Sequence, residues 1–457
     1  MVRLLRQALQ LDTRAGAAWP GFRLRDQVLA LVAQPAGPVA LAGDSVPPRD
    51  YQVVDAEFHI SLRHGVPPDS LSGFRVPLAW RGELRKGTAI SYRSGESGWM
   101  LHTLVHEAFH TFQHRVAERH EGSFPGGPTQ VFPDTLIEAI GLLNLESHYL
   151  AQALRAPSPR EATALARTAL AVRTRRCALL GRDECQAERL TEQTEGTAVY
   201  VAAFVLDDGA SSRKLDSLQR ALGPIQQVRQ LQRVHFYDSG HAWLILLDRL
   251  GPKDWKSRVE HSAPDLVLAE AIRFTPAVAD SIVAAGFDST AVATAGEQAR
   301  HLVASEVRLR DSVQSAFWAQ PGVPVRIYWP TMGSMNSERS ADSGAVIQNF
   351  IIQLPDGTQR TYGVGAREET MRFGDGPDRL TIRGLAVTET TPSWVWVSIV
   401  VTIVRGHVAL VDGHPVPLDR PGTDILGALE LNLANVSLVS RRAQLKVFSD
   451  SIAVRMQ

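Results

Sequence analysis

The chain has 457 residues, which exceeds the usual size of a single hydrophobic core, so two or three domains are expected. Hydrophobic residues make up 44% and charged residues 21%, as in ordinary globular proteins, and no run of about 18 apolar residues offers a membrane span. Lys plus Arg and Asp plus Glu both total 48, so no global charge favours nucleic acid, an anionic membrane or an acidic substrate.

Residues 1–97 are expected to form a small β-rich region. The first 22 residues contain charges but no apolar run of about 7 to 15 residues, so no secretory signal is expected. Residues 23–93 are rich in Pro and Gly and contain short alternating runs, FHISL at 58–62 and TAISYR at 88–93. This alternation predicts a small β-sheet.

A helical pattern begins near Gly98 and contains the run HEAFH at 106–110. On a helix, positions i and i+4 share a face, so His106 and His110 can direct two imidazole nitrogens at one cation. Glu107 is turned just enough to reach a water on that cation. The run therefore predicts one bound Zn²⁺ ion, with Glu107 as the base that takes a proton from zinc-activated water.

The alternative is a helix with solvated histidines, because His102 and His114 continue the same four-residue spacing. Those two histidines are expected at the surface or behind the ligands. Since catalytic zinc usually has three protein ligands, a third one must come from another part of the chain.

Three further helices are predicted before residue 207. The second begins at Asp134, and the third begins with Ser158 as N-cap, Pro159 at the first position and Glu161 completing a capping box. Cys177 and Cys185 then flank a GRDE turn, and a local disulfide and two unpaired thiols both remain open. The fourth helix, 185–206, has Glu188, Glu192 and Glu195 on one face.

The segment TEGTAVY at 194–200 resembles the N-E-G-F-A-x-Y segment of the aminopeptidase N-like gluzincins, a class of zinc peptidases. In that family the Glu is the third zinc ligand, so the resemblance implies Glu195. VHFYDSGHAWLILLDRLG at 234–251 is similar to the Y-E-K-G segment, whose Tyr stabilises the oxyanion, which implies this role for Tyr237. Tyr237 is expected just before a helix that opens near Ser239, with His235 and His241 as rivals for its role.

Two departures from the family pattern limit the resemblance. In this sequence 84 residues separate His110 from Glu195, far more than in the family, so Glu192 is a substitute ligand or an acceptor that orients a zinc-bound His. Glu138 and Glu146 on the second helix are expected to be solvated or to support a ligand. No G-x-M-x-N exopeptidase motif precedes the zinc helix. By analogy with the family, TAISYR at 88–93 is expected to lend an edge strand to an extended peptide.

Helices continue to about residue 318, and beyond Pro321 the pattern changes to strands. WVWVSIVVTIV at 394–404 and AQLKVFSDSIAVRM at 443–456 read as strands, with Asp356-Gly357 and Asp412-Gly413 as hairpin turns. A C-terminal all-β domain over 321–457 is therefore expected, in which Trp394 and Trp396 pack within the sheet.

Together these features predict an α+β protein with a zincin-like, mainly helical catalytic region at 98–320, preceded by a small sheet and followed by an all-β domain. The expected function is a zinc-dependent hydrolase with a peptide or protein substrate. Two alternatives stand beside it: a zinc hydrolase with a non-peptide substrate, and a zinc-stabilised binding protein whose β-domain binds a partner.

Overall fold

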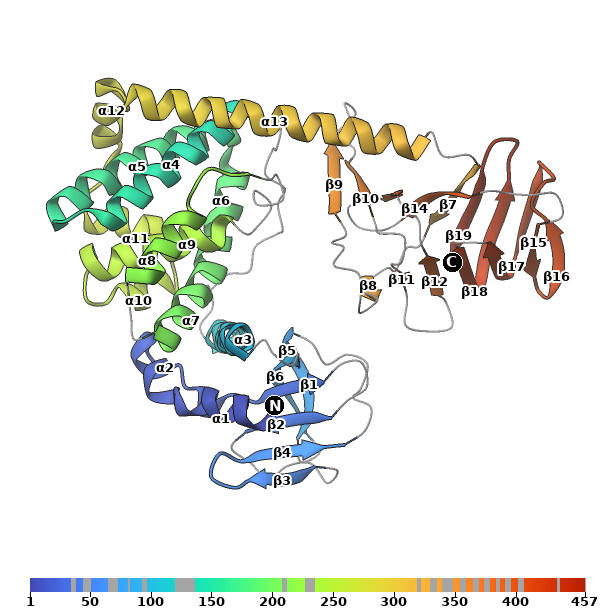
Figure 1. Cartoon of the computed structure of the whole chain (residues 1–457), viewed down its shortest axis with the longest axis horizontal. Coiled ribbons are helices and arrows are strands. Elements are labelled where there is room, and N and C mark those ends of the chain that lie inside the picture. The colour runs from blue at the N-terminus through green and yellow to red at the C-terminus, as the bar shows by residue number, and fades with distance from the viewer. Residues whose placement is uncertain are drawn as a thin grey trace. The chain divides into compact units, whose positions relative to one another are not determined.

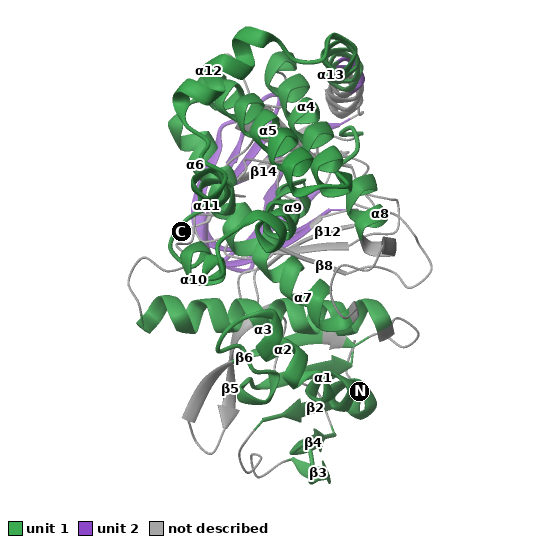
Figure 2. Ribbon diagram, turned by 90° about the vertical axis from the view of Figure 1, so that its left-hand side faces the viewer, with its two compact units in different colours: residues 1–303 green, residues 304–457 purple. Residues whose placement is uncertain are grey.

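A computed structural model gives the structure of the chain in two compact units, Met1–Val303 (unit 1) and Ala304–Gln457 (unit 2) (Figure 2). The residues that it describes are 1–33, 38–43, 51–64, 73–80, 83–92, 97–119, 136–207, 212–226, 235–318, 322–328, 335–338, 348–353, 359–364, 370–373, 379–383, 387–390, 396–401, 407–433 and 436–456. The boundary between the units falls inside one long helix, α13 (Ser289–Trp318).

Unit 1 begins with short helices and a six-stranded sheet (Figure 1). These elements are α1 (Val2–Gln10), α2 (Asp12–Ala18), the 3-10 helix η1 (Leu24–Asp26), β1 (Leu29–Ala33), β2 (Val39–Ala42), β3 (Gln52–Asp55), β4 (Ile60–Arg63), β5 (Gly73–Trp80) and β6 (Glu83–Tyr92). The strand order is β3-β4-β2-β1-β6-β5, with β1 and β6 parallel and the other neighbours antiparallel. Leu29 and Leu31 of β1 face the main core, and Ala30 and Val32 face a smaller apolar cluster, as the two-residue period of a strand requires.

The strand that contains residues 88–92 lies inside this sheet and not at its edge. On one side of β6, Thr88–Tyr92 pair with Leu29–Ala33 of β1, and on the other side β5 pairs with β6 in a hairpin. The expectation that 88–93 offers an edge strand is therefore wrong for Thr88 and Ala89, which have β1 on one side and β5 on the other. Residues 90–92 pair with β1, and residue 93 lies outside the described residues. The hairpin partner occupies the outer position, so the edge strand beside β6 is β5.

A series of helices follows the sheet and makes up the rest of unit 1 (Figure 1). They are α3 (Ser97–Arg119), α4 (Ile137–Arg155), α5 (Pro159–Leu180), α6 (Arg182–Thr191), the π-helix η2 (Glu192–Gly196), α7 (Thr197–Asp207), α8 (Ser212–Ala221), α9 (His235–Leu250), α10 (Trp255–Val259), α11 (Pro264–Ala271), α12 (Pro276–Ala285) and α13. The predicted start of α5 is confirmed, because Ser158 Oγ accepts a hydrogen bond of 3.2 Å from the backbone N–H of Glu161. Helix α9 begins at His235, four positions before the expected opening near Ser239.

Helix α3 is held against the N-terminal elements by aromatic and polar contacts. Phe109 packs edge-on against Trp19 and Phe22, with ring centroids 5.5 and 5.1 Å away. Thr88 Oγ1 of β6 lies 2.8 Å from Thr111 Oγ1 of α3, so a hydrogen bond joins the strand to the helix. These contacts fix the helix that carries the HEAFH run beside the sheet.

The two cysteines form a disulfide between α5 and α6. Cys177 lies in the last turns of α5 and Cys185 in the first turns of α6, with Cα atoms 5.6 Å apart. Of the two states that the sequence leaves open, the structure has the disulfide, and it closes the α5–α6 turn.

Unit 2 is a 13-stranded sheet in which every described neighbour pair is antiparallel except β7 and β19. Its strands are β7 (Val323–Tyr328), β8 (Met335–Glu338), β9 (Gln348–Gln353), β10 (Gln359–Val364), β11 (Thr370–Phe373), β12 (Arg379–Arg383), β13 (Val387–Thr390), β14 (Trp396–Val401), β15 (Val408–Val411), β16 (His414–Pro417), β17 (Thr423–Leu433), β18 (Val436–Val447) and β19 (Ile452–Met456). Asp412 and Gly413 join β15 to β16 with φ values of 51° and 76°, as a type I′ hairpin turn requires. The expected Asp356-Gly357 turn and Trp394 lie outside the described residues.

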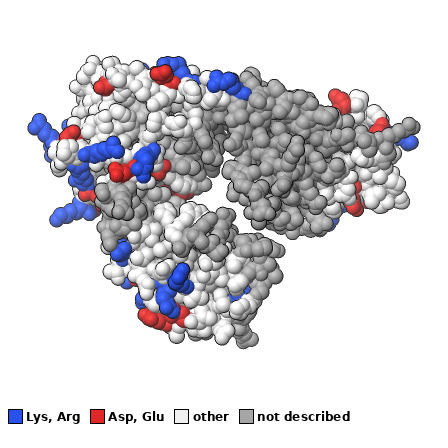
Figure 3. All heavy atoms as spheres, in the orientation of Figure 1, with Lys and Arg blue, Asp and Glu red and all other residues white. Residues whose placement is uncertain are grey.

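Charged residues of both signs are intermixed over the described surface of the face drawn in Figure 3. Within the described parts of the chain, no helix combines the length and apolarity needed to cross a bilayer. The chain is thus an α+β protein with a small N-terminal sheet, a helical region and a C-terminal sheet.

Candidate metal centre

Two histidines of α3 and one glutamate of η2 meet in the interior of unit 1. The Nε2 atoms of His106 and His110, one helical turn apart, lie 3.0 Å from each other. Glu195 approaches from η2, and its Oε2 atom lies 3.1 Å from Nε2 of His110 and 3.3 Å from Nε2 of His106. All three side chains are buried. The structure therefore brings together the three residues that the sequence predicts as metal ligands.

The spacing of these three atoms suits a small divalent cation. Four ligands placed tetrahedrally about 2.0 Å from zinc lie about 3.3 Å from one another, close to the three distances above. Two imidazole nitrogens and one carboxylate suit zinc, and also cobalt, nickel, iron or copper, better than they suit calcium or magnesium. The cluster could therefore bind a metal ion through three protein ligands.

A π-helical turn presents Glu195 to the two histidines. Residues 182–207 form a continuous helical segment in which η2 separates α6 from α7. In a π-helix the hydrogen bonds run from i to i+5 and widen the turn, so residues three positions apart diverge more than on an α-helix. Glu192 and Glu195 were expected on one face, but Glu195 points to His110 while Glu192 contacts Arg173. Such single π turns occur frequently at functional sites.

Gln113 orients the imidazole of His110. Its Oε1 atom lies 2.7 Å from Nδ1 of His110, so Nδ1 donates to it and Nε2 is left with a lone pair for a cation. Gln113 Nε2 in turn donates to Thr194 O and Thr197 Oγ1, at 2.9 and 2.6 Å. Burial alone would lower the pKa of His110, but the hydrogen bond and charge of Glu195, with the charge of Glu107 and the hydrogen bond of Gln113, together raise that pKa.

Glu107 follows His106 on α3 and is half-buried. Its negative charge is one of the causes that raise the pKa of His110, three positions later on the same helix. Its backbone carbonyl oxygen lies 3.3 Å from the hydroxyl oxygens of both Thr88 and Thr111, so the position of Glu107 is tied to β6.

Tyr237 lies on helix α9, with its ring beside that of His106. Its ring is stacked on that of His106, with centroids 6.2 Å apart and an angle of 21° between the planes. Tyr237 belongs to the first turn of α9 and not to the segment before it, because the helix begins at His235. His102, one turn before His106, also stacks on it at 6.3 Å, while His102 and His114 are both half-buried.

The two rivals of Tyr237 contact other parts of unit 1. His235 is buried, and its Nε2 atom lies 3.3 Å from Ser147 Oγ of α4. His241 packs edge-on against Tyr200 of α7, with ring centroids 6.1 Å apart. Within this group, the ring of Tyr237 stacks on a histidine of the metal cluster.

The other acidic candidates belong to ion pairs away from the cluster. Glu192 is fully buried and binds Arg173 through both of its oxygens, at 2.6 and 2.5 Å, and it accepts a hydrogen bond of 2.6 Å from Ser239 Oγ. Glu146 lies beside Arg173 in the same interior, with its Oε1 atom 2.8 Å from Nε. Glu138 is exposed and pairs with Arg175.

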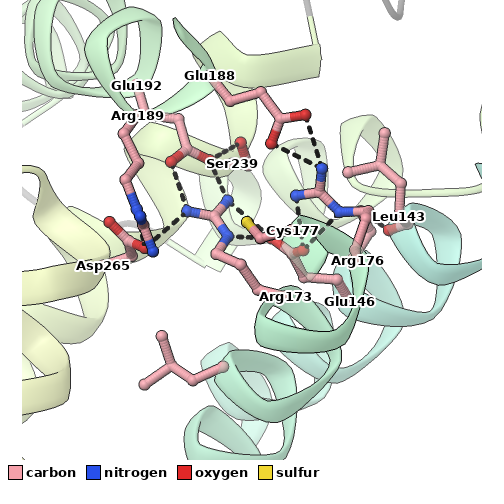
Figure 4. Close-up of polar contacts among 12 residues, drawn as sticks. Leu143, Glu146, Arg173, Arg176, Cys177, Glu188, Arg189, Glu192, Ser239 and Asp265 are labelled. Carbon is pink, nitrogen blue, oxygen red and sulfur yellow. Dashed lines mark hydrogen bonds and ion pairs between the residues drawn. The ribbon is translucent and has the colours of Figure 1, made fainter. Parts of the chain in front are cut away.

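Sequence reasoning did not find the buried ion network to which Glu192 belongs. Figure 4 shows two arginines of α5 that point at carboxylates from four other helices or turns. The members of this network, called the arginine network below, are Glu146, Arg173, Arg176, Glu188, Arg189, Glu192, Ser239 and Asp265. Their only sequence signal is that charged residues fall on the buried faces of amphipathic helices, which the pattern alone cannot distinguish from solvated faces.

No family model matches the chain, and no curated protein or solved structure is similar to it. The resemblance to gluzincins therefore stays a prediction from the three sequence segments.

Proposed function

We propose that this protein is a zinc-dependent hydrolase of the gluzincin type, with a zincin-like catalytic region and a peptide substrate. The observation that carries the proposal is the buried triangle of His106, His110 and Glu195, whose ligand atoms lie 3.0 to 3.3 Å apart. The order of the three segments along the chain and the stacking of Tyr237 on His106 add support.

A zinc ion held by these residues would lower the pKa of a water and polarise the carbonyl of the substrate. Glu107 takes a proton from the attacking water and later gives it to the leaving amine. Its place beside the cluster, on a helix fixed to β6 through Thr88 and Thr111, supports this role.

Tyr237 donates a hydrogen bond from its hydroxyl to the oxygen that gains negative charge as the carbonyl is attacked. A phenol held by stacking beside the ligands is preorganised for this task, because little side-chain freedom is lost when the substrate binds. This contact also favours an enzyme over a metal-stabilised scaffold, since a scaffold needs no hydroxyl-bearing ring beside the metal ligands.

The decisive experiment is Glu107→Gln, assayed on a peptide library with zinc content measured in parallel. The variant is expected to bind zinc normally and to lose at least about a hundredfold in kcat/KM, because only the base is removed. Glu118→Gln, an exposed glutamate on the same helix, is the matched control and should keep full activity. Full activity of Glu107→Gln would contradict the mechanism.

Two further results would change the proposal in different ways. If the purified protein binds zinc but cleaves no peptide in the library, the substrate is a non-peptide electrophile and the peptidase assignment fails. If His106→Asn binds as much zinc as wild type, the metal site itself is wrong; His148→Asn, an exposed histidine on α4, is the control for that measurement.

A further inference from the structure

The helix pair α4–α5, which occupies the long interval between His110 and Glu195, carries charged residues in its interior. Glu146, Arg173 and Arg176 have 1%, 2% and 0% of their surfaces exposed. Removing a charge from water is costly, so buried charges persist where they are paired and hydrogen-bonded. The partners of these three residues show what the helix pair does for the rest of unit 1.

Arg173 makes the largest set of contacts in the arginine network. Its guanidinium binds Glu192 through Nη1 and Nη2, Glu146 through Nε at 2.8 Å, and Asp265 through Nη1 at 3.2 Å. Its charged plane also lies over the ring of Trp243 of α9, 5.0 Å from the centroid. One planar side chain of α5 thereby fixes residues of α4, η2 and α11 at once (Figure 4), and it also contacts α9 through Trp243.

Glu192 is the point at which this network meets the metal cluster. It lies in the same π turn as Glu195, three positions earlier, so a shift of Glu192 moves the backbone that carries the ligand. Its second partner, Ser239, lies two positions after Tyr237 on α9. Glu192 therefore joins the turn that holds a metal ligand to the helix that holds the stacked tyrosine.

The backbones of η2 and α9 touch at this joint, because each has a glycine there. A Cβ atom on Gly240 would lie 2.7 Å from the carbonyl oxygen of Glu192 and 2.9 Å from the Cα atom of Gly196. No flexible side chain separates the two elements, so the relative position of Glu195 and Tyr237 follows directly from how the network holds Glu192.

Contacts of Arg176 and a disulfide hold α6, the helix that leads into the π turn. Arg176 binds Glu188 of α6 through Nη1, at 2.7 and 2.6 Å, and Glu146 through Nη2 at 2.9 Å. The disulfide of Cys177, the next residue, with Cys185 ties α5 to α6 at the same level. Both ends of the segment 182–196 are therefore anchored on α5.

We propose that Arg173 is a positioning residue that acts through Glu192 and sets the geometry of the ligand Glu195. This inference rests on the proposed metal site. A buried ion pair often stabilises a fold no better than a well-packed apolar pair of the same volume. What it adds is a bidentate geometry that admits one orientation of the carboxylate. The network thus specifies the metal site more than it stabilises unit 1.

The test compares metal binding by the full-length zinc form of the wild type with that of the double variant Arg173→Met, Glu192→Met. This variant leaves no carboxylate of the network without an arginine, because Glu146 keeps Arg176 and Asp265 keeps Arg189. Zinc affinity is measured by competition with a chromophoric chelator, and the geometry of the site by the visible spectrum of the cobalt-substituted protein.

The double variant is expected to keep its thermal midpoint within a few degrees but to bind zinc about 10 to 100 times more weakly, with an altered cobalt spectrum. Arg175→Met is the matched control, since Arg175 lies on the same helix and pairs with the exposed Glu138, and it should match wild type in both readouts. A double variant with wild-type affinity and spectrum would overturn the inference.

If the double variant does not fold, Arg173→Lys decides the matter, because it keeps the charge and removes the bidentate contact. Wild-type zinc affinity and cobalt spectrum in Arg173→Lys would then overturn the inference. The two proposals fail separately. If the wild-type protein binds no zinc, both the proposed function and the role of Arg173 are wrong. If the wild type binds zinc and Glu107→Gln abolishes its activity, the proposed function stands whatever the Arg173 variants do.

Discussion

At the scale of single residues, the role proposed for Tyr237 depends on one group, its hydroxyl. Replacing it with Phe keeps the ring that stacks on His106 and removes only the hydroxyl. If that hydroxyl stabilises the developing oxyanion, kcat should fall by about 10² to 10³ while zinc content and KM stay nearly constant. Steady-state kinetics on the best library peptide would measure this. Tyr149→Phe, which removes a hydroxyl that accepts from the Asp288 backbone, should keep kcat, and equal losses in both variants would contradict the assignment.

The buried His235 makes the stability of unit 1 depend on pH. Burial lowers the pKa of His235 to about 4, with Arg176 and Arg173 acting in the same direction and Glu146 opposing them. An unfolded His has a pKa of about 6.5, so protonation favours the unfolded chain. The contribution of this group to the free energy of unfolding is complete above about pH 6.5 and is lost as the pH falls towards 4, by about 3 kcal/mol in all.

The measurement is chemical denaturation of the metal-free protein at pH 7 and pH 4.5, because acid also releases metal from histidine ligands. His235→Leu removes the titrating group and leaves Ser147 Oγ bonded to the carbonyl oxygen of Leu143 at 2.9 Å. The loss of stability between the two pH values should be smaller in the variant. Identical losses in wild type and variant would show that His235 titrates normally.

At the scale of elements, the sequence predicts those features of the helices that depend on residues close together in the chain. The HEAFH run places two histidines on one face of α3, and Ser158 caps α5, because both signals act within one helical turn. The sequence predicts too late a start for α9, since HFYDSG contains turn-forming residues that tertiary contacts hold in a helix. The resemblance to gluzincins, and not the helical pattern, singled out Glu195.

The parts that could not be predicted depend on contacts between distant segments. A helical wheel puts Glu192 and Glu195 on one face, and only the π turn separates them. On a helical wheel Arg173 and Arg176 resemble residues of a solvated face, but Glu146, 27 and 30 positions earlier in the chain, pairs with both of them in the interior. Pairing of charges across five elements has no local pattern, so the network appears only in three dimensions.

The contact between η2 and α9 carries its own prediction. An alanine at Gly240 would meet only backbone atoms of Glu192 and Gly196, which cannot rotate away, so the two elements must separate. Gly240→Ala should lower the free energy of unfolding by about 1 to 3 kcal/mol and weaken zinc binding, as measured by denaturation and by chelator competition.

Gly296→Ala is the matched control for that substitution. A Cβ atom there meets nothing closer than Arg300 Nη1 at 3.6 Å, and an alanine suits the interior of α13 better than glycine. This variant should be as stable as wild type or slightly more so, with unchanged zinc affinity. A Gly240→Ala protein that behaves the same way would mean that η2 and α9 tolerate separation.

At the scale of the whole molecule, the metal ligands all come from unit 1, so metal binding should stabilise that unit. At a free zinc concentration about a thousand times the dissociation constant, binding adds about 4 kcal/mol to the free energy of unfolding. Differential scanning calorimetry with and without a chelator should therefore show one transition that moves down on metal removal. A chain cut after Trp318 should show the same shift, and failure of that shorter chain to respond to zinc would contradict the assignment of the site to unit 1.

The π turn has a consequence for how this site could change in descendants of the gene. A π turn accommodates one residue more than an α turn and so absorbs that residue without changing the phase of the helix on either side. Loss of the codon for Gln193 or Thr194 would return the turn to ordinary helix with α6 and α7 still in register. Loss of a codon elsewhere in 182–207 has no such compensation and would rotate the residues on one side of it by about 100° relative to those on the other. A deletion inside the π turn is therefore the one-residue deletion that this helical segment accommodates best.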